Sequence, residues 1–217
     1  MGAIALGAVL SADLHVGERV AVFGQGVLGL LTTQLATLNG ADVTAVDILA
    51  GRLALAQKWA AHTVDAQAGD PAEAVRKHTG ATGADVAIEI SGSYPALHEA
   101  LRTVGIGGRV VAAGFYQGEG IGLRLGEEFH LNRVHIVASQ IGGVPAALQS
   151  RWTVERLHKV FVDLVQAGRV DVAPLVTDVV PATDVAAAFH LLDERPQDAL
   201  QVVLDFRTDD ERQEVPA

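Results

Sequence analysis

Short apolar runs alternate with helical patterns along most of the chain. From Arg19 onward, the runs RVAVF and DVTAVD are rich in Val and Ala, and a helical pattern over about residues 26–38 separates them. Such alternation predicts parallel strands joined by right-handed helical crossovers. Four more strands are expected, at HTVD, ADVAIEI, RVVAAG and VHIVAS. The pattern therefore predicts an α/β fold with a doubly wound, six-stranded parallel sheet.

The remaining segments are expected to extend this sheet into one domain over residues 1–206. Helices are predicted near residues 50–61, 71–78 and 95–104, and the apolar start of the chain, residues 1–18, is interpreted as a lead-in helix and turn. Residues 144–206 are expected to form two helices and a final strand, QVVLDF, with Thr183 capping the second helix. A Pro-rich stretch around residues 174–181 is where the chain could leave the main sheet. Residues 207–217, charged and without apolar anchors, are predicted to be a disordered tail.

Charge and composition exclude several classes of function. The 217 residues carry a formal net charge of −10, which disfavours binding to nucleic acid and to anionic membrane surfaces. No cysteine is present, which rules out disulfides, thiol nucleophiles and cysteine-ligated zinc or iron–sulfur sites. The apolar start has no Lys or Arg before it and no apolar run is long enough to cross a membrane, so we expect a cytoplasmic protein.

A glycine-rich turn is the strongest chemical motif. The first predicted strand runs into GQGVLG, a GxGxxG pattern between a strand and a helix. Gly24 permits a tight turn, Gly26 lets a pyrophosphate approach the backbone, and Gly29 lets the helix pack close to the strand. The N–H groups of Val27 and Leu28 would then meet the phosphates at the helix N-terminus. A glycine-rich turn without a ligand is the alternative interpretation.

An acidic residue supports the nucleotide interpretation. Asp47 ends the second predicted strand, 18 residues after Gly29, where a carboxylate can accept hydrogen bonds from both ribose hydroxyls of an adenosine. The same charge would repel a 2′-phosphate, so NAD(H) is favoured over NADP(H). Two alternatives stay open: Asp47 could merely cap the next helix, and S-adenosylmethionine enzymes also combine a glycine-rich turn with an acidic residue on the second strand.

Several segments together resemble a known family. SADLHVGERVAVFGQGVLGLLTTQLA and VTAVDILAGRLALAQKWAA, the latter with Asp47 and Arg52, resemble the nucleotide domain of medium-chain zinc-type alcohol dehydrogenases. DVAIEISG, GGRVVAAGFYQG, FHLNRVHIVASQIGGVP and the C-terminal PLVTDVVPATDVAAAFHLLDE resemble later segments of the same Rossmann half. The resemblance implies an NAD-dependent oxidoreductase that transfers hydride between an alcohol or carbonyl group and nicotinamide. It also implies that further residues at the ends of strands four to six border the cofactor: Ser91, Gly92, Gly114, Phe115, Ser139 and Gln140.

The resemblance also implies partners. The sixth strand, Val134 to Ala138, would pair across a two-fold axis in a homodimer. The family's N-terminal domain, which supplies Cys and His ligands to a catalytic zinc, is expected to be missing here, because the chain begins where that domain has almost ended. A separate catalytic domain or subunit would then complete the enzyme. A non-catalytic NAD-binding or dimerisation module and a truncated dehydrogenase repurposed for zinc-independent chemistry are the alternatives.

No catalytic residue can be named from the sequence. His130 and His135 are expected to point to opposite faces rather than to one metal, so we expect no zinc. Asp85 and Glu89 share a face of strand four but are too far apart for one proton transfer. Neither tyrosine of the chain has a Lys four residues later, so the Tyr-Lys pair of short-chain dehydrogenases is missing. The six other histidines are expected to be solvated or capping.

Overall fold

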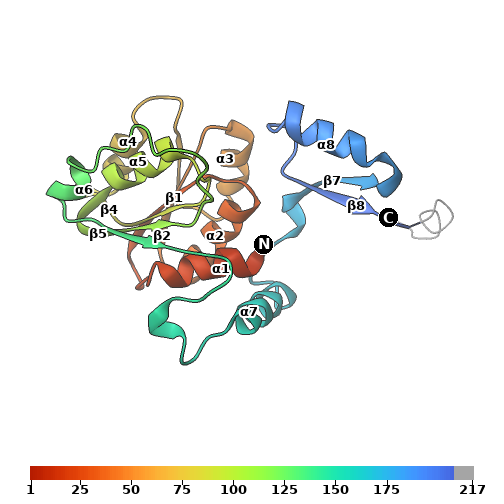
Figure 1. The fold of residues 1–217 in the computed structure, drawn as a ribbon, viewed down its shortest axis with the longest axis horizontal. Coiled ribbons are helices and arrows are strands. Elements are labelled where there is room, and N and C mark those ends of the chain that lie inside the picture. Colours follow the sequence, from red (N-terminus) through yellow and green to blue (C-terminus); the bar gives the residue numbers. More distant parts are fainter. Residues whose placement is uncertain (208–217) are drawn as a thin grey trace. The chain divides into compact units, whose positions relative to one another are not determined.

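The computed structural model describes residues 1–207, which form two compact units, Met1–Asp171 and a second unit that begins at Val172. The predicted tail lies almost wholly outside the described residues. The first unit contains the six-stranded sheet, with strand order β3-β2-β1-β4-β5-β6 and every neighbouring pair parallel (Figure 1). The predicted fold class is confirmed.

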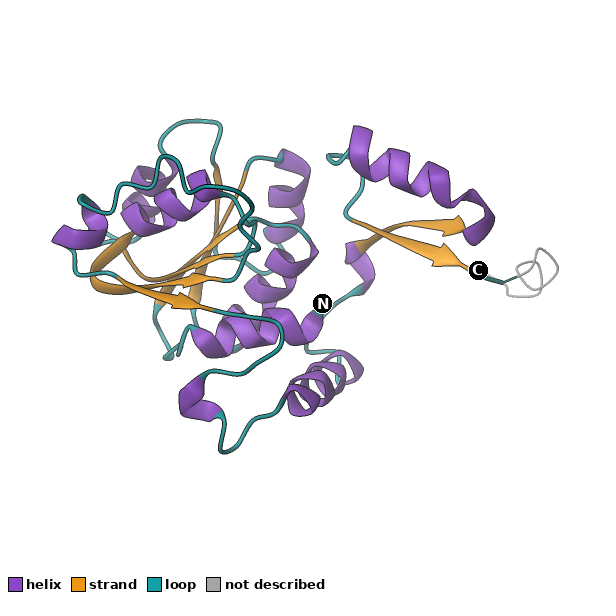
Figure 2. Ribbon diagram, in the orientation of Figure 1, coloured by secondary structure: helices purple, strands orange, loops and turns teal. Residues whose placement is uncertain are grey.

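Helices alternate with the strands of the first unit, as the hydrophobic pattern predicts (Figure 2). The elements in chain order are α1 (Gly2–Ser11), β1 (Arg19–Phe23), α2 (Val27–Leu38), β2 (Asp42–Asp47), α3 (Ala50–Ala56), β3 (His62–Asp65), α4 (Pro71–His78), β4 (Ala84–Glu89), α5 (Tyr94–Thr103), β5 (Val104–Ala112), α6 (Glu128–Leu131), β6 (His135–Ala138), η1 (Ala146–Leu148) and α7 (Val154–Gln166).

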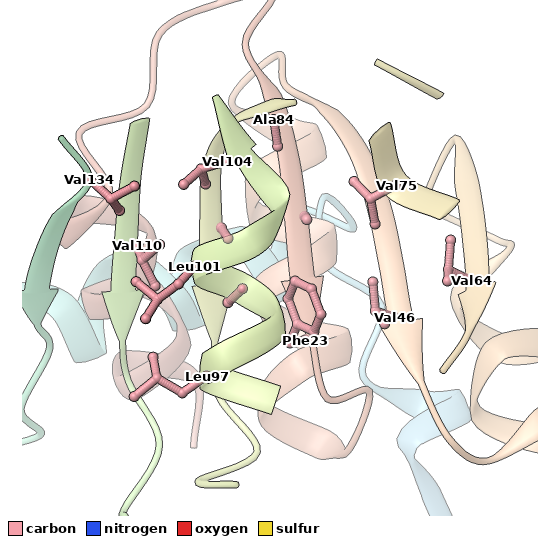
Figure 3. Close-up of a cluster of buried hydrophobic side chains, with 13 residues drawn as sticks. Phe23, Val46, Val64, Val75, Ala84, Leu97, Leu101, Val104, Val110 and Val134 are labelled. Carbon is pink, nitrogen blue, oxygen red and sulfur yellow. The ribbon is translucent and has the colours of Figure 1, made fainter. Parts of the chain in front are cut away.

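The central strands are buried on both faces. Val20 and Val22 of β1 are buried on one face, and Ala21 and Phe23 are buried on the other. On the Ala21 and Phe23 side, apolar side chains from α4, α5 and five strands form one cluster (Figure 3). Burial on both faces explains why these strands are continuous in Val, Ala and Ile instead of alternating with polar residues.

The predicted helix near residues 157–165 belongs to the first unit. It is α7, which contacts α1, and a Cβ atom built at Gly2 would lie 2.1 Å from the ring of Phe161. The Gln34 side chain donates to the carbonyl of Asp171 (3.0 Å) and accepts from its N–H (2.8 Å). Close packing at Gly2 and this pair of hydrogen bonds hold residues 154–171 on the sheet domain.

The second unit is a small βαβ arrangement. Its elements are η2 (Ala173–Leu175), β7 (Val176–Pro181), η3 (Ala182–Asp184), α8 (Val185–Glu194) and β8 (Gln201–Asp205), and β7 pairs with β8 in parallel. The prediction of Thr183 as a helix cap is wrong: Thr183 lies in the 3-10 turn, and Asp184 precedes α8. The strand β7 was not predicted, because Pro174 lies just before it and Pro181 is its last residue. That residues 1–206 form a single domain stays a prediction.

A search of the described residues finds no helix that is both long and apolar enough to cross a membrane. The cytoplasmic location stays a prediction.

Candidate functional site

Most of the predicted site residues gather at one edge of the sheet. Because all six strands are parallel, their carboxyl ends lie at the same edge. The glycine turn follows β1, Asp47 ends β2, and the loops that begin at Ile90, Ala113 and Ser139 follow β4, β5 and β6. The strand order reverses between β1 and β4, and ligands of open α/β sheets bind in the crevice at such a switch point.

The glycine turn has the geometry that the GxGxxG spacing predicts. Gly24 has a φ of +91°, and a Cβ there would lie 2.8 Å from the Ser91 Cβ. A Cβ at Gly29 would lie 1.7 Å from the Gly24 carbonyl oxygen, so only glycine lets α2 approach the turn this closely. A Cβ at Gly26 would meet only Arg52 Nη1 within 4 Å, at 3.9 Å. Among the described residues, the space in front of Gly26 is therefore open.

That open space faces the start of a helix. Gly26 is the N-cap of α2, and its position has no side-chain cap. The N–H groups of the first helical turn, which begins with Val27 and Leu28, have no acceptor within an α-helix. Together with the helix dipole, such groups favour a bound anion. The turn therefore fits the pyrophosphate of a dinucleotide.

Gln25, between the first two glycines, has a structural role that the sequence analysis missed. Its side chain is fully buried. Its Nε2 donates to the Val22 carbonyl (2.9 Å), and its Oε1 accepts from the Thr33 hydroxyl (3.0 Å). Gln25 thus joins β1 to α2 behind the turn. A polar residue between two glycines was the only sequence signal for this role.

Asp47 is joined to the glycine turn itself. The carboxylate is only 7% exposed; Oδ2 accepts from the Gln25 N–H (2.5 Å) and Oδ1 from the Leu49 N–H (2.8 Å). Each oxygen retains a second lone pair, so the group can accept from a ribose hydroxyl while it holds the turn. The alternative of a helix cap does not describe Asp47, since Leu49 precedes α3. Arg52, in the first turn of α3, lies near Gly26 and so borders the same space.

The loops after β4 and β5 touch each other. A Cβ at Gly92 would lie 2.8 Å from the Phe115 carbonyl oxygen, and a Cβ at Gly114 would lie 2.2 Å from the Gly92 N–H nitrogen. Ser91 is exposed beside Gly24, and the Phe115 side chain is 84% exposed. The structure thus brings Gly24, Ser91, Gly92, Gly114 and Phe115 together at the switch point.

Ser139 and Gln140 lie farther from the turn, at the end of the edge strand β6. The Ser139 N–H donates to the Ala112 carbonyl (3.0 Å), which continues the β5–β6 pairing. The Gln140 side chain accepts from the Gly142 N–H (2.6 Å) and is therefore engaged within its own loop. Three strand spacings separate β6 from β1, roughly 14 Å. Cofactor contact by these two residues stays a prediction.

Comparison with known proteins identifies the family of this chain. Residues 27–158 match the family described as "Zinc-binding dehydrogenase". The chain belongs to the zinc-binding dehydrogenase family. Among curated members, D-guloside 3-dehydrogenase of Escherichia coli (strain K12) is 31% identical over 205 residues, which cover 93% of this chain and 59% of that protein. The chain therefore spans less than two thirds of the length of this relative.

Solved structures of family members have the same fold. An E. coli oxidoreductase/dehydrogenase of unknown specificity aligns with a TM-score of 0.83 at 25% identity, over 95% of this chain and 56% of its own. A Sinorhizobium meliloti protein assigned to the zinc-binding dehydrogenases and solved with NADP bound aligns with a TM-score of 0.72 at 27% identity, over 93% and 56%. These likenesses support a cofactor-binding fold that covers nearly the whole chain.

The candidate metal ligands of this chain do not gather in the part that the structure describes. The chain has no cysteine, and no group of three or more His, Asp or Glu side chains in the described part of the chain could hold a metal ion. His130 is on α6 and His135 is on β6. The absence of a zinc site stays a prediction.

Four other titratable residues that the sequence analysis considered, Asp85, His98, His62 and His78, have partners away from the glycine turn. Asp85 accepts from the Arg19 N–H (2.8 Å) at the opposite edge of the sheet from the glycine turn. His98 is buried, not solvated as predicted, and its Nε2 lies 2.9 Å from Arg124 Nη2. His62 and His78 stack with ring centroids 4.2 Å apart. None of these groups borders the glycine turn.

Proposed function

We propose that this chain is the NAD(H)-binding half of a zinc-type alcohol dehydrogenase-like oxidoreductase. Bound nicotinamide would exchange a hydride with an alcohol or carbonyl substrate. The observation that carries the proposal is the Asp47 carboxylate, held 2.5 Å from the Gln25 N–H beside an open turn at the start of α2. The turn would bind pyrophosphate and Asp47 the adenosine ribose.

The same carboxylate supports NAD(H) over NADP(H). Asp47 is largely buried, so its charge is weakly screened at the place where a 2′-phosphate would lie. Arg52 near Gly26 is the opposing influence, because a guanidinium could accept such a phosphate, and a relative at 27% identity was solved with NADP. The unit negative charge on the ribose side favours the cofactor without the phosphate.

The substrate and its zinc would be held by a catalytic domain or subunit with its own metal ligands. The length of the curated relatives, of which this chain matches 59% in the case of D-guloside 3-dehydrogenase, supports this part of the proposal. Within this chain, the residues proposed to act are those that bind and orient the cofactor.

We also propose a homodimer formed through β6. This strand is the last of the six in the sheet, and His135, Ile136 and Ala138 are exposed. An exposed edge strand offers unpaired backbone groups to a second copy of itself. Pairing of two such edges would continue the sheet across a two-fold axis.

Calorimetric titration of the chain with NADH, with S-adenosylmethionine as the control ligand, tests the proposed function. Saturable binding of NADH alone is the expected result. Binding of S-adenosylmethionine alone would reassign the site to a different class of enzyme, and binding of neither would mean that the glycine turn has lost its ligand.

Replacement of Asp47 by Asn tests the ribose contact. Loss of the charge should weaken NADH binding by about 1–3 kcal/mol, and it should weaken NADPH binding less, because the repulsion of the 2′-phosphate disappears with it. Asp65→Asn is the matched control. Asp65 pairs in register with Asp47 at the end of β3, and its Oδ1 accepts from the Gln67 N–H in the same way (2.8 Å). If the Asp47→Asn variant bound NADH as tightly as the control variant does, the assignment of Asp47 to the ribose would be contradicted.

A further inference from the structure

Glu89 is a fully buried carboxylate at the end of β4, and its two oxygens accept four hydrogen bonds. Oε1 accepts from the N–H of Ser91 (2.8 Å) and from its hydroxyl, while Oε2 accepts from the Gly92 N–H (3.2 Å) and from the Tyr116 hydroxyl. Burial of a carboxylate is costly unless its oxygens are hydrogen-bonded. Here both oxygens are satisfied, and every donor comes from a loop at the cofactor edge.

These hydrogen bonds join two separate loops. Ser91 and Gly92 belong to the loop after β4, whereas Tyr116 belongs to the loop after β5. The two backbones are in contact where Gly92 meets Gly114 and Phe115, and Ser91 also packs against Gly24 of the glycine turn. The position of Glu89 therefore decides how the β4 and β5 loops lie against the pyrophosphate turn.

The position of Glu89 and its hydrogen-bond donors in the sheet indicates which half of the dinucleotide they would face. Asp47 lies on the β2 side of β1, and Glu89 ends β4, the neighbour of β1 on the opposite side. A dinucleotide bound at the switch point places one nucleotide on each side of the first strand. With adenosine on the β2 side, the nicotinamide nucleotide would lie against the loops after β4 and β5.

We propose that Glu89 and Tyr116 are positioning residues for the nicotinamide half of the dinucleotide: Glu89, through the Tyr116 hydroxyl and the Ser91–Gly92 backbone, holds the two loops that form that half of the site. This inference rests on the proposed function. It assigns no cofactor contact to either side chain, since both act through the loops they join.

The Tyr116 hydroxyl keeps its proton throughout the working pH range. Burial, and then the hydrogen bond to Glu89, raise the pKa of Tyr116 far above its usual value. The hydroxyl is therefore the donor in its hydrogen bond to Glu89. The Tyr94 ring packs against Tyr116, with centroids 5.3 Å apart, and its hydroxyl donates to the Gly118 carbonyl (3.0 Å) instead.

The neighbouring tyrosines supply a matched pair of variants. Tyr116→Phe removes the hydrogen bond that joins the β5 loop to Glu89. Tyr94→Phe removes a hydrogen bond from the adjacent ring to Gly118 of the same loop without touching Glu89, so it controls for the loss of a loop hydrogen bond that does not involve Glu89. Both replacements retain the aromatic ring, so we expect the contact between the two rings to be kept. Each variant is titrated with NADH and with ADP, which lacks the nicotinamide nucleotide, and the emission of bound NADH is recorded.

In Tyr116→Phe, the NADH dissociation constant should rise about fivefold or more while the ADP constant stays within about twofold, because loss of one charge-assisted hydrogen bond loosens only the nicotinamide side. The emission of bound NADH should also move towards that of free NADH. Tyr94→Phe should leave both constants and the emission unchanged.

Equal weakening of NADH and ADP in Tyr116→Phe would overturn the inference, since it would indicate general loosening of the site. An unchanged NADH constant, or the same loss in Tyr94→Phe, would also overturn it. If the unaltered protein binds ADP but not NADH, or neither ligand, the proposed function itself fails, and the inference fails with it.

Discussion

Gln25 and Glu89 are polar residues, and both are fully buried behind the cofactor edge. Gln25 joins β1 to α2, and Glu89 joins the β4 loop to the β5 loop. A buried polar side chain holds a loop in one place because every alternative position leaves a desolvated group without a partner. The groups that would touch the cofactor, by contrast, are backbone N–H groups and exposed side chains, together with the largely buried Asp47.

His78 leads to a prediction about pH. Its ring stacks on His62, and burial, followed by the charge of His62, lowers the pKa of His78 below 6.5, with Asp42 opposing the shift. The unfolded chain therefore binds a proton at His78 more readily than the folded protein does. The free energy of unfolding should fall as the pH is lowered through 6.5, and this contribution should be constant at higher pH.

Urea unfolding at several values between pH 8 and pH 5 would measure this effect. The variant His78→Gln should lose part of the decrease, whereas His158→Gln, on an exposed position of α7, serves as the control. If the free energy of unfolding of His78→Gln falls with pH as much as that of the unaltered protein, groups other than His78 cause the decrease.

At the scale of elements, the approach of α2 to β1 is the critical packing. Gly29→Ala would place a methyl carbon 1.7 Å from the Gly24 carbonyl oxygen, and the obstacle is backbone that has no rotamer to change. We expect a loss of about 2 kcal/mol or more in the free energy of unfolding, together with loss of NADH binding, because α2 must move away from the turn. Urea unfolding and calorimetry measure the two effects.

Gly51→Ala is the matched control for this substitution. Gly51 lies in α3, and among the described residues nothing outside its own helix lies within 4 Å of a Cβ built there. Alanine restricts the unfolded chain more than glycine does, so the control should be stabilised by about 0.5–1 kcal/mol. If both variants were equally stable, the close approach of α2 would not be essential.

At the scale of the whole molecule, the proposed homodimer gives a prediction about backbone hydrogen bonding. The Ser139 N–H points towards β5, so by alternation the N–H of Ala138 points to the open side of β6. Ala138→Pro removes that donor without breaking the pairing with β5, and it should convert a dimer to a monomer. Sedimentation analysis gives the mass, and Ala138→Ser is the control that keeps the N–H. A variant that stays dimeric would place the interface elsewhere.

The sequence by itself determined the fold class and the main chemical motif. Its strand–helix alternation predicts the six parallel strands, and the GxGxxG spacing predicts the conformations at Gly24 and Gly29, because both depend on interactions local in the chain. The position of Asp47 at the end of β2 was predicted for the same reason, since a local apolar run defines that strand.

Only the tertiary structure showed how Asp47 and Glu89 are engaged. Tyr116 lies 27 residues from Glu89 along the chain, and Asp47 lies 22 residues from Gln25. The pairing of parallel strands brings these groups together, and no spacing in the sequence encodes their hydrogen bonds. The strand β7 was missed for a related reason: its partner, β8, begins 20 residues after β7 ends, and prolines just before β7 and at its last position obscure the local pattern. Long-range pairing, which local periodicity cannot report, decided these features.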